Sequence, residues 1–365
     1  MKLSPVKSFV VSPFIVAWIS ACALEAPSSA PAALSKQVSP ALASVKPPRQ
    51  PKANHFHISE AKLALLPKPE QPKALTDALL GLQAGSIDER VVKLKAKALA
   101  DMVYVQGGSF MRGDFAKLMG VEGVTRITYN EDDKVVREIT LSDFWIGKYK
   151  TTYAEFDVFT DATGRPRTGM DFNGKYRHPV LPAGAYWKEA KDYCQWLGKI
   201  TGQPFDLPTE AQWEYAARSR GQFFMIATDD GNIEYGRNVP YGAQERVLAP
   251  TDSPFGFRSY PIALFPPNPL GLYDMTHDGK EWVNDWYASN AYEQAEARDP
   301  KGPASGERKV TRGWGRDDLK IGAAVWRRSA QPVPVREGIA ENDDRRKLVP
   351  VSTDSAPQVR CVAAP

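Results

Sequence analysis

The sequence predicts a loop-rich α+β domain with little regular secondary structure over residues 102–365. Two observations lead to this fold class. Short apolar runs of strand type come first, and helical patterns follow at 186–200 and from residue 209 onward. Beyond residue 260, Gly, Pro, Asn and Asp are dense between short apolar runs, which is typical of turns and loops. We therefore expect few helices and strands, joined by long connections.

The chain opens with the features of a bacterial export signal. Two lysines precede a largely apolar run at 9–19, which is too short for a membrane span and ends in small residues at Cys22. The tetrapeptide Ile-Ser-Ala-Cys resembles a lipobox, in which cleavage leaves an acylated N-terminal cysteine. We expect residues 1–22 to be a lipoprotein signal peptide; an ordinary signal peptide with an incidental cysteine is the alternative. Ala23 favours the outer membrane of a Gram-negative cell, so the expected location is the periplasm, with Cys22 as the lipid anchor.

Two segments separate this signal from the main domain. Residues 23–57 are predicted to be a disordered tether, because Ala, Pro, Ser and Val dominate without a helical or strand period. Residues 58–101 are predicted to be a helical segment packed on the main domain, with the longer of two periodic stretches at 74–99. His55 and His57 have no third ligand nearby, and we interpret them as solvated loop residues.

Charge and cysteine content narrow the choice of partners. The formal net charge is only +4 on 365 residues, and basic residues are interleaved with acidic ones, so nucleic acid is not an expected partner. Setting Cys22 aside leaves Cys194 and Cys361, an even pair in a compartment where disulfides persist. One disulfide between them is the expected state.

Strands are expected at the start of the main domain. Residues 102–105 are a short apolar run, two glycines make a turn, and residues 109–113 are a second strand fragment. Further strands are expected at 135–141 and 144–149.

Two helices are expected after these strands. Residues 186–200 are amphipathic, with Gly202 available as the C-terminal cap. The apolar face carries Trp187, Ala190, Cys194 and Leu197. The second helix begins at a capping box, because Thr209 and Gln212 have the spacing that satisfies two backbone N–H groups reciprocally.

Several long motifs occur in order along the main domain. They are a strand pair at 102–113, an I-x-K-Y-x-x-T segment within 144–159, FDLPTEAQWEYAAR at 205–218, NPLGLYDM at 268–275, EWVNDWY at 281–287 and a terminal apolar strand at 359–362. Together they resemble the formylglycine-generating, or sulfatase-modifying-factor, family, whose fold is similar to that of C-type lectins. The resemblance spans residues 102–365. It also implies the disulfide, because the family positions that correspond to Cys194 and Cys361 are bridged.

The resemblance further implies an active site that this chain has lost. In the copper-dependent members two catalytic cysteines follow a G-G-S turn, and the second lies five residues after the first. The matching positions are Asp318 and Ala323, Gly315 replaces the serine of the turn, and Lys280 replaces a tryptophan. A carboxylate or a methyl group cannot act as a thiolate. We therefore expect no catalytic cofactor and no enzymatic activity of this kind, and the H-x-x-x-H-x-E iron site of related sulfoxide synthases is missing as well.

A structural calcium ion is the one cofactor that the resemblance implies. The family binds it in the loop that matches residues 274–281, where Asp274 and Glu281 offer the hard oxygen ligands that calcium prefers. His277 and Asp278 replace a glycine and an asparagine of the family in this loop. Two loop carboxylates that bond to the backbone are the alternative interpretation.

For function, the resemblance implies binding rather than catalysis. Family members of this kind include periplasmic immunity lipoproteins, which protect a cell from the phospholipase effectors of its own type VI secretion system. We expect this chain to bind and inhibit a secreted phospholipase toxin of the phospholipase D class, while its lipid anchor holds it at the membrane. Tryptophan and arginine anchor many protein interfaces. The predicted interface consists of Trp314, Arg316, Asp317, Asp318 and Trp326.

An enzyme or maturation factor with altered chemistry is the alternative function. It would resemble the periplasmic family member that assists pyoverdine maturation. This alternative predicts a pocket in which Asp317 and Asp318 have perturbed pKa values near Arg327.

Overall fold

The computed structural model describes residues 69–119, 130–170, 173–240, 248, 259–314, 328–332, 340–341, 348–349 and 356–365. Cys22, His55, His57 and the predicted signal peptide and tether lie outside the described residues. Within these ranges no helix combines the length and the apolar character that crossing a membrane demands.

The described elements are short, and the loop-rich α+β prediction is confirmed. The helices are α2 (Lys73–Gly81), α3 (Ile87–Ala100), η2 (Phe115–Met119), α4 (Tyr153–Thr163), α5 (Trp187–Thr201) and α6 (Glu210–Ala217). The strands are β1 (Met102–Val105), β2 (Gly108–Arg112), β3 (Arg137–Leu141), β4 (Phe144–Gly147), β5 (Phe205–Asp206), β6 (Gly279–Trp286), β7 (Arg308–Trp314), β8 (Ser329–Pro332), β9 (Ala340–Glu341), β10 (Leu348–Val349) and β11 (Val362–Ala363). The four strands and two helices predicted in the main domain are present, although β3 and β4 are two residues shorter than predicted.

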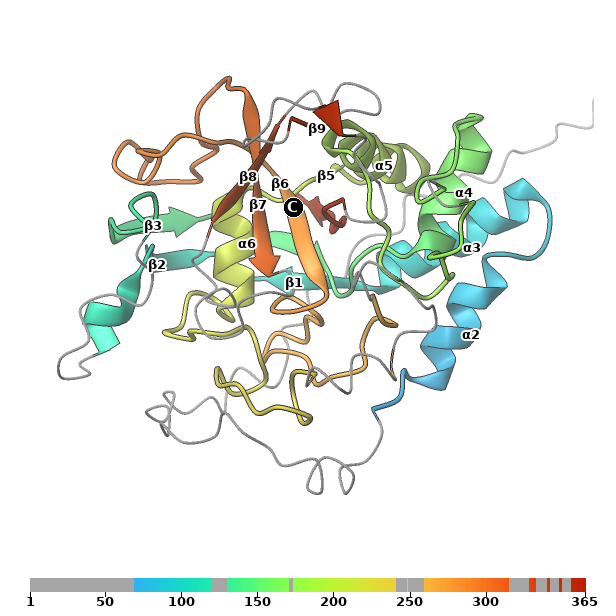
Figure 1. Ribbon diagram of the computed structural model, residues 1–365, viewed down its shortest axis with the longest axis horizontal. Coiled ribbons are helices and arrows are strands. Elements are labelled where there is room, and N and C mark those ends of the chain that lie inside the picture. Colours follow the sequence, from blue (N-terminus) through green and yellow to red (C-terminus); the bar gives the residue numbers. More distant parts are fainter. Residues whose placement is uncertain are drawn as a thin grey trace, which may run out of the picture.

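A four-stranded antiparallel sheet with the order β1-β4-β11-β5 lies at the centre of the fold (Figure 1). Along β4, Phe144 and Ile146 belong to one hydrophobic cluster and Trp145 to another. This alternation is that of a strand buried on both faces. The cluster of Trp145 contains α4 and α5, and the other contains α6, so the sheet separates two apolar cores.

The predicted helical stretch at 74–99 is two helices, α2 and α3, rather than one. The break has a local cause. Ser86 is the N-cap of α3, where it accepts from the N–H of Glu89, while Glu89 accepts from the N–H of Ser86 at 2.7 Å. The S-x-x-E spacing of Ser86 and Glu89 is the sequence signature of this helix start. Helix α3 packs against α4, where Arg90 pairs with Asp161 at 2.7 Å.

Helix α4 was not predicted, although its sequence carries both end signals. Thr152 and Glu155 form a capping box, and Gly164 ends the helix with φ 66°. A left-handed residue at this place is common at helix C-termini and favours glycine. Residues 153–160 are buried along their whole length, so the helix lacks the one-sided apolar pattern on which the prediction of α5 relied.

Helix α5 is tied to the central sheet by the predicted disulfide. Cys194 on its buried face is bonded to Cys361, with 5.6 Å between the two Cα atoms. Gly202 caps the helix in the left-handed conformation, as expected. The bridge joins positions 167 residues apart and fixes the chain end against the core.

A second sheet, with the order β6-β7-β8, positions the site described next. Helix α6 packs on β6 and β7, with Trp213, Val283 and Val310 in one buried cluster. The capping box predicted at its start is present, with Thr209 accepting from the N–H of Gln212. Because α6 packs on this sheet, the carboxylates of Glu210 and Glu214 lie against β7, where both accept from Arg312.

Candidate functional site

The predicted interface lies mostly outside the described residues. Arg316, Asp317, Asp318 and Trp326 are not described, nor are Gly315, Ala323 and Arg327. Only the backbone of Trp314 is described: it ends β7 and pairs with Gly279 of β6. The other four interface residues therefore follow β7 in the chain and precede β8. The described structure shows how these two strands are held.

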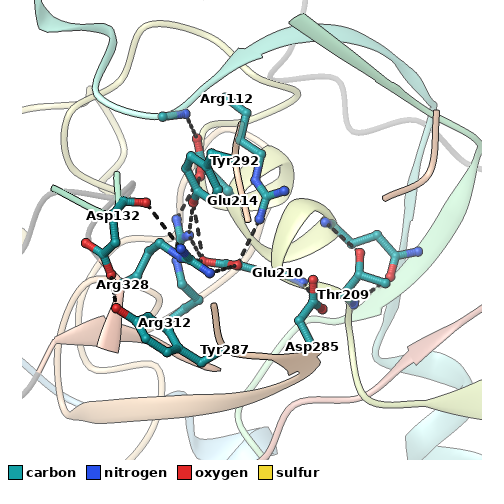
Figure 2. A network of polar contacts seen from close by, with 12 residues as sticks. Arg112, Asp132, Thr209, Glu210, Glu214, Asp285, Tyr287, Tyr292, Arg312 and Arg328 are labelled. Atoms are coloured by element: carbon teal, nitrogen blue, oxygen red, sulfur yellow. Dashed lines mark hydrogen bonds and ion pairs between the residues drawn. The ribbon is translucent and has the colours of Figure 1, made fainter. Parts of the chain in front are cut away.

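Arg312 of β7 and Arg328, which precedes β8, converge on Glu210 at the start of α6 (Figure 2). Arg328, directly before β8, donates from Nε and Nη2 to the two oxygens of Glu210 at 2.6 and 3.0 Å. Arg312 of β7 donates from Nη1 to Oε1 at 2.8 Å. Arg112 of β2 adds a contact of 2.9 Å to Oε2. Three arginines, from β2, from β7 and from the position before β8, thus share one carboxylate.

Glu214, one turn along α6, extends this cluster. It accepts from Arg312 at 2.9 Å and from Arg218 at 2.9 Å. The hydroxyl of Tyr292 accepts from Arg312 at 2.9 Å and donates to both glutamates. Charge-assisted bonds between buried groups are strong, and a charge left buried without a partner would be costly. We call Arg112, Glu210, Glu214, Arg218, Asp285, Tyr292, Arg312 and Arg328 the arginine–glutamate cluster.

Two acids of this cluster, Glu210 and Asp285, have pKa values shifted in opposite directions. Burial would raise the pKa of Glu210, but Arg328, Arg112 and Arg312 outweigh burial and hold it at about 2. Burial, together with the nearby carboxylate of Glu210, raises the pKa of Asp285 to about 6. Asp285 accepts from the backbone N–H of Glu210 at 2.7 Å. The first acid is ionised at any physiological pH, while the second titrates near neutrality.

Glu210 suits a structural clamp rather than proton transfer. A general base works best with a pKa near the operating pH and a lone pair directed at the substrate. Glu210 has neither, because its pKa is low and its oxygens accept from arginines. The cluster holds β7 and β8 to α6, and so fixes both ends of the chain segment that contains the predicted interface.

The structure places the two predicted calcium ligands, Asp274 and Glu281, in a second buried cluster at the start of β6. Both oxygens of Glu281 accept from Arg360, at 2.8 and 2.9 Å, and Oε2 also accepts from the indole of Trp213 at 2.8 Å. Asp274 Oδ2 accepts from the N–H of Ala263 at 2.8 Å. Burial raises the pKa of Asp274, whereas burial of Glu281 is outweighed by Arg360, which lowers its pKa.

Lys150 fills the space that faces this loop. Its ammonium donates to the carbonyl oxygens of His277, Asp278 and Gly279 at 2.8, 3.0 and 3.0 Å. It also donates to Oε1 of Gln358 at 2.7 Å. These residues do not fit a calcium ion, because an ammonium already occupies the carbonyl oxygens and Glu281 is committed to Arg360. Over the described ranges, moreover, no three His, Cys, Asp or Glu side chains are arranged to hold a metal.

Sequence reasoning brought Asp274 and Glu281 together but did not find the first cluster or the role of Lys150. Glu210 and Glu214 lie within the quoted 205–218 motif, but the local signal at this position is only the capping box. Lys150 lies within the 144–159 motif and looks like an ordinary surface lysine in the sequence. No local pattern marks these charged residues as buried, because their partners come from distant segments of the chain.

Comparisons with known proteins support the resemblance. Residues 88–333 match the sulfatase-modifying factor enzyme 1-like domain family. The chain is 27% identical over 257 residues to the formylglycine-generating enzyme of Bos taurus, which covers 67% of this chain and 66% of that one. It is 29% identical over 261 residues to the serine/threonine-protein kinase pkn1 of Chlamydia caviae, covering 64% of this chain and 37% of the kinase. The chain thus spans about a third of the kinase and just under two thirds of the bovine enzyme.

A solved structure has the same fold. PvdO from Pseudomonas aeruginosa superposes with a TM-score of 0.52 at 25% identity, over 72% of this chain and 94% of PvdO. The likeness covers the main domain rather than a single motif.

Proposed function

The chain belongs to the family of sulfatase-modifying factor enzyme 1-like domains, and from this premise we propose that it is a non-catalytic periplasmic binding protein. The observation that carries the proposal is the state of its cysteines. Of the three in the chain, Cys194 and Cys361 are joined in a buried disulfide, and Cys22 lies in the predicted lipobox. No pair of thiols is therefore left for thiolate chemistry.

The proposed partner is a secreted phospholipase toxin of the phospholipase D class. Inhibition by an immunity protein is steric, so it needs a rigid surface and no reactive group. The arginine–glutamate cluster supports this role, because Arg312 and Arg328 hold both ends of the segment that carries Arg316, Asp317 and Asp318. Lipidation at Cys22 would keep the inhibitor beside the lipids that the toxin attacks.

The test uses a purified phospholipase D-class toxin, taken from a gene beside this one where one is found, and the full chain released from its anchor. We expect stoichiometric inhibition of phosphatidylcholine vesicle hydrolysis. Replacing Trp314 and Arg316 with Ala should weaken binding by about 2 kcal/mol or more, roughly 30-fold in Kd. Arg165→Ala is the matched control, because Arg165 lies after α4 on the other apolar core and pairs with Asp192 at 2.8 Å.

Two outcomes would overturn the proposal. The first is no binding and no inhibition by the wild-type chain. The second is copper-dependent turnover of a cysteine-containing sulfatase peptide above a metal-only control, which would show that the chain is an enzyme. If both interface variants inhibit like wild type, the interface lies elsewhere on the domain, and the helices before Met102 would be tested next.

The likeness to PvdO supports a second candidate, a periplasmic maturation factor with altered chemistry. In that case Asp317 and Asp318 would act on a small substrate near Arg327. Replacing both aspartates with Asn would then abolish maturation in cells. The wild-type chain would in that case bind no phospholipase toxin. A secreted lipase gene beside this one favours inhibition, and a siderophore gene cluster favours maturation.

A further inference from the structure

We propose that the loop at 277–279 is a cation cage whose resident cation is the ammonium of Lys150, so that this family member needs no metal ion there. This inference is independent of the proposed function. It rests on the contacts of one buried lysine and on the shape of the loop that surrounds it.

The cage consists of oxygens that converge on one point. Three successive carbonyls, of residues 277, 278 and 279, and the amide oxygen of Gln358 lie 2.7 to 3.0 Å from Nζ of Lys150. Oε1 of Glu281 lies 4.0 Å from the same nitrogen. The side chain of Lys150 is fully buried. An ammonium has three N–H donors, and a ring of carbonyl oxygens at these distances satisfies all of them.

Two successive residues of the loop have positive φ angles. Asp278 has a φ of 61°, a left-handed conformation that is costly for a residue with a side chain. Gly279 follows with a φ of 98°, and a Cβ there would lie 2.7 Å from the amide nitrogen of Gln358. The glycine thus lets Gln358 approach closely enough to complete the cage. Backbone strain of this kind persists only where surrounding contacts hold it.

An ammonium fits this cage better than calcium does. Calcium binds oxygen at about 2.3 to 2.6 Å and prefers ionised carboxylates. Here Arg360 already pairs with both oxygens of Glu281. The two carboxylate oxygens of Asp278 lie 2.9 and 3.1 Å from the hydroxyl of Ser259, which donates its single hydrogen to this carboxylate. Lys150 binds the carbonyl oxygens of the loop and Arg360 pairs with the carboxylate of Glu281. Together these two positive charges take the place of a divalent cation.

The cage also supports the base of the predicted interface. Gly279 pairs with Trp314 at the point where β7 ends. The backbone N–H of Gln358 donates to the carbonyl oxygen of Lys280 at 2.7 Å, which holds Gln358 against β6. Because the cation is covalently attached, chelators cannot remove it. We therefore expect the fold at this place to be insensitive to calcium.

The experiment measures thermal unfolding of the full chain with excess CaCl2 and with excess EDTA. The wild-type Tm should agree within about 1 °C between the two. Lys150→Met keeps the length of the side chain but removes its charge, and should lower the Tm by about 10 °C because several buried oxygens lose their donor. Lys150→Ala should also lower the Tm. Methylammonium chloride should restore part of this decrease in Tm, whereas choline chloride should not.

Lys148 supplies the matched controls. It lies two residues away and is half-buried, with its ammonium over the rings of Tyr149 and Tyr273 rather than in the cage. Lys148→Met should keep a Tm near wild type, and Lys148→Ala should not respond to methylammonium. The proposal is wrong if Lys150→Met is as stable as wild type. It is also wrong if the wild-type chain carries stoichiometric calcium or is stabilised by it, a measurement that remains decisive should the Lys150 variants fail to fold.

Discussion

Replacing Glu210 with Gln tests whether the arginine–glutamate cluster holds the second sheet to α6. The substitution keeps the size of the side chain but removes the charge that Arg112, Arg312 and Arg328 share. Three guanidinium groups would then lie buried around a neutral amide. Because removing one member of a buried ion pair leaves its partners unpaired, the free energy of unfolding should fall by about 3 to 5 kcal/mol.

The pKa of Glu210 gives a second measure of the same effect. A lowering from 4.5 to about 2 corresponds to about 3 kcal/mol of stability at neutral pH. A depressed pKa stabilises the folded state above the unfolded pKa, and that stability is lost as pH falls through the folded value. The difference between wild type and Glu210→Gln should therefore be full at pH 7 and should shrink below about pH 4.5.

Urea unfolding followed by tryptophan fluorescence measures this difference at several pH values. Glu234→Gln is the matched control, because Glu234 also pairs with an arginine, Arg237 at 2.6 Å, but has a side chain that is 58% exposed. Such a pair should contribute less than about 1 kcal/mol. The reasoning fails if Glu210→Gln lies within 1 kcal/mol of wild type at pH 7, on the order of the control, or if the difference does not depend on pH.

Three further results are expected. Replacing Cys194 and Cys361 with Ala should lower the free energy of unfolding by about 5 kcal/mol, given the 167-residue separation, and two free thiols in the denatured, non-reduced wild-type chain would contradict the bridge. Asp285 has a folded pKa raised to about 6, so its stabilisation is full below about pH 4 and is lost as pH rises through 6. Asp285→Asn should therefore be more stable than wild type at pH 8 and equal to it near pH 4, and equal stability at both pH values would refute the assignment. Gly279→Ala should cost about 1 to 3 kcal/mol, measured by urea unfolding, because the new Cβ would meet Gln358 at a φ that disfavours side chains; Gly81→Ala, where no atom lies within 4 Å, is the control and should be neutral or stabilising.

Local sequence signals were enough to place those helices whose ends are fixed by neighbouring residues in the chain. The amphipathic period and Gly202 placed α5, and the capping box at Thr209 placed the start of α6. The same signals were present at Ser86 and Thr152 and would have placed α3 and α4. The pairing of Cys194 with Cys361 required only a count of cysteines, once Cys22 was assigned to the predicted export signal.

The charged clusters could not be read from the chain, because their members come from distant segments. Glu210 meets Arg112, Arg312 and Arg328 across 98 to 118 positions of sequence, and no local period marks these arginines as buried. Lys150 meets Gln358 across 208 positions. A sequence states which charges a chain carries and which short elements it forms. Only the packing of those elements decides which charges lose their water, and a charge without water must find a partner or shift its pKa.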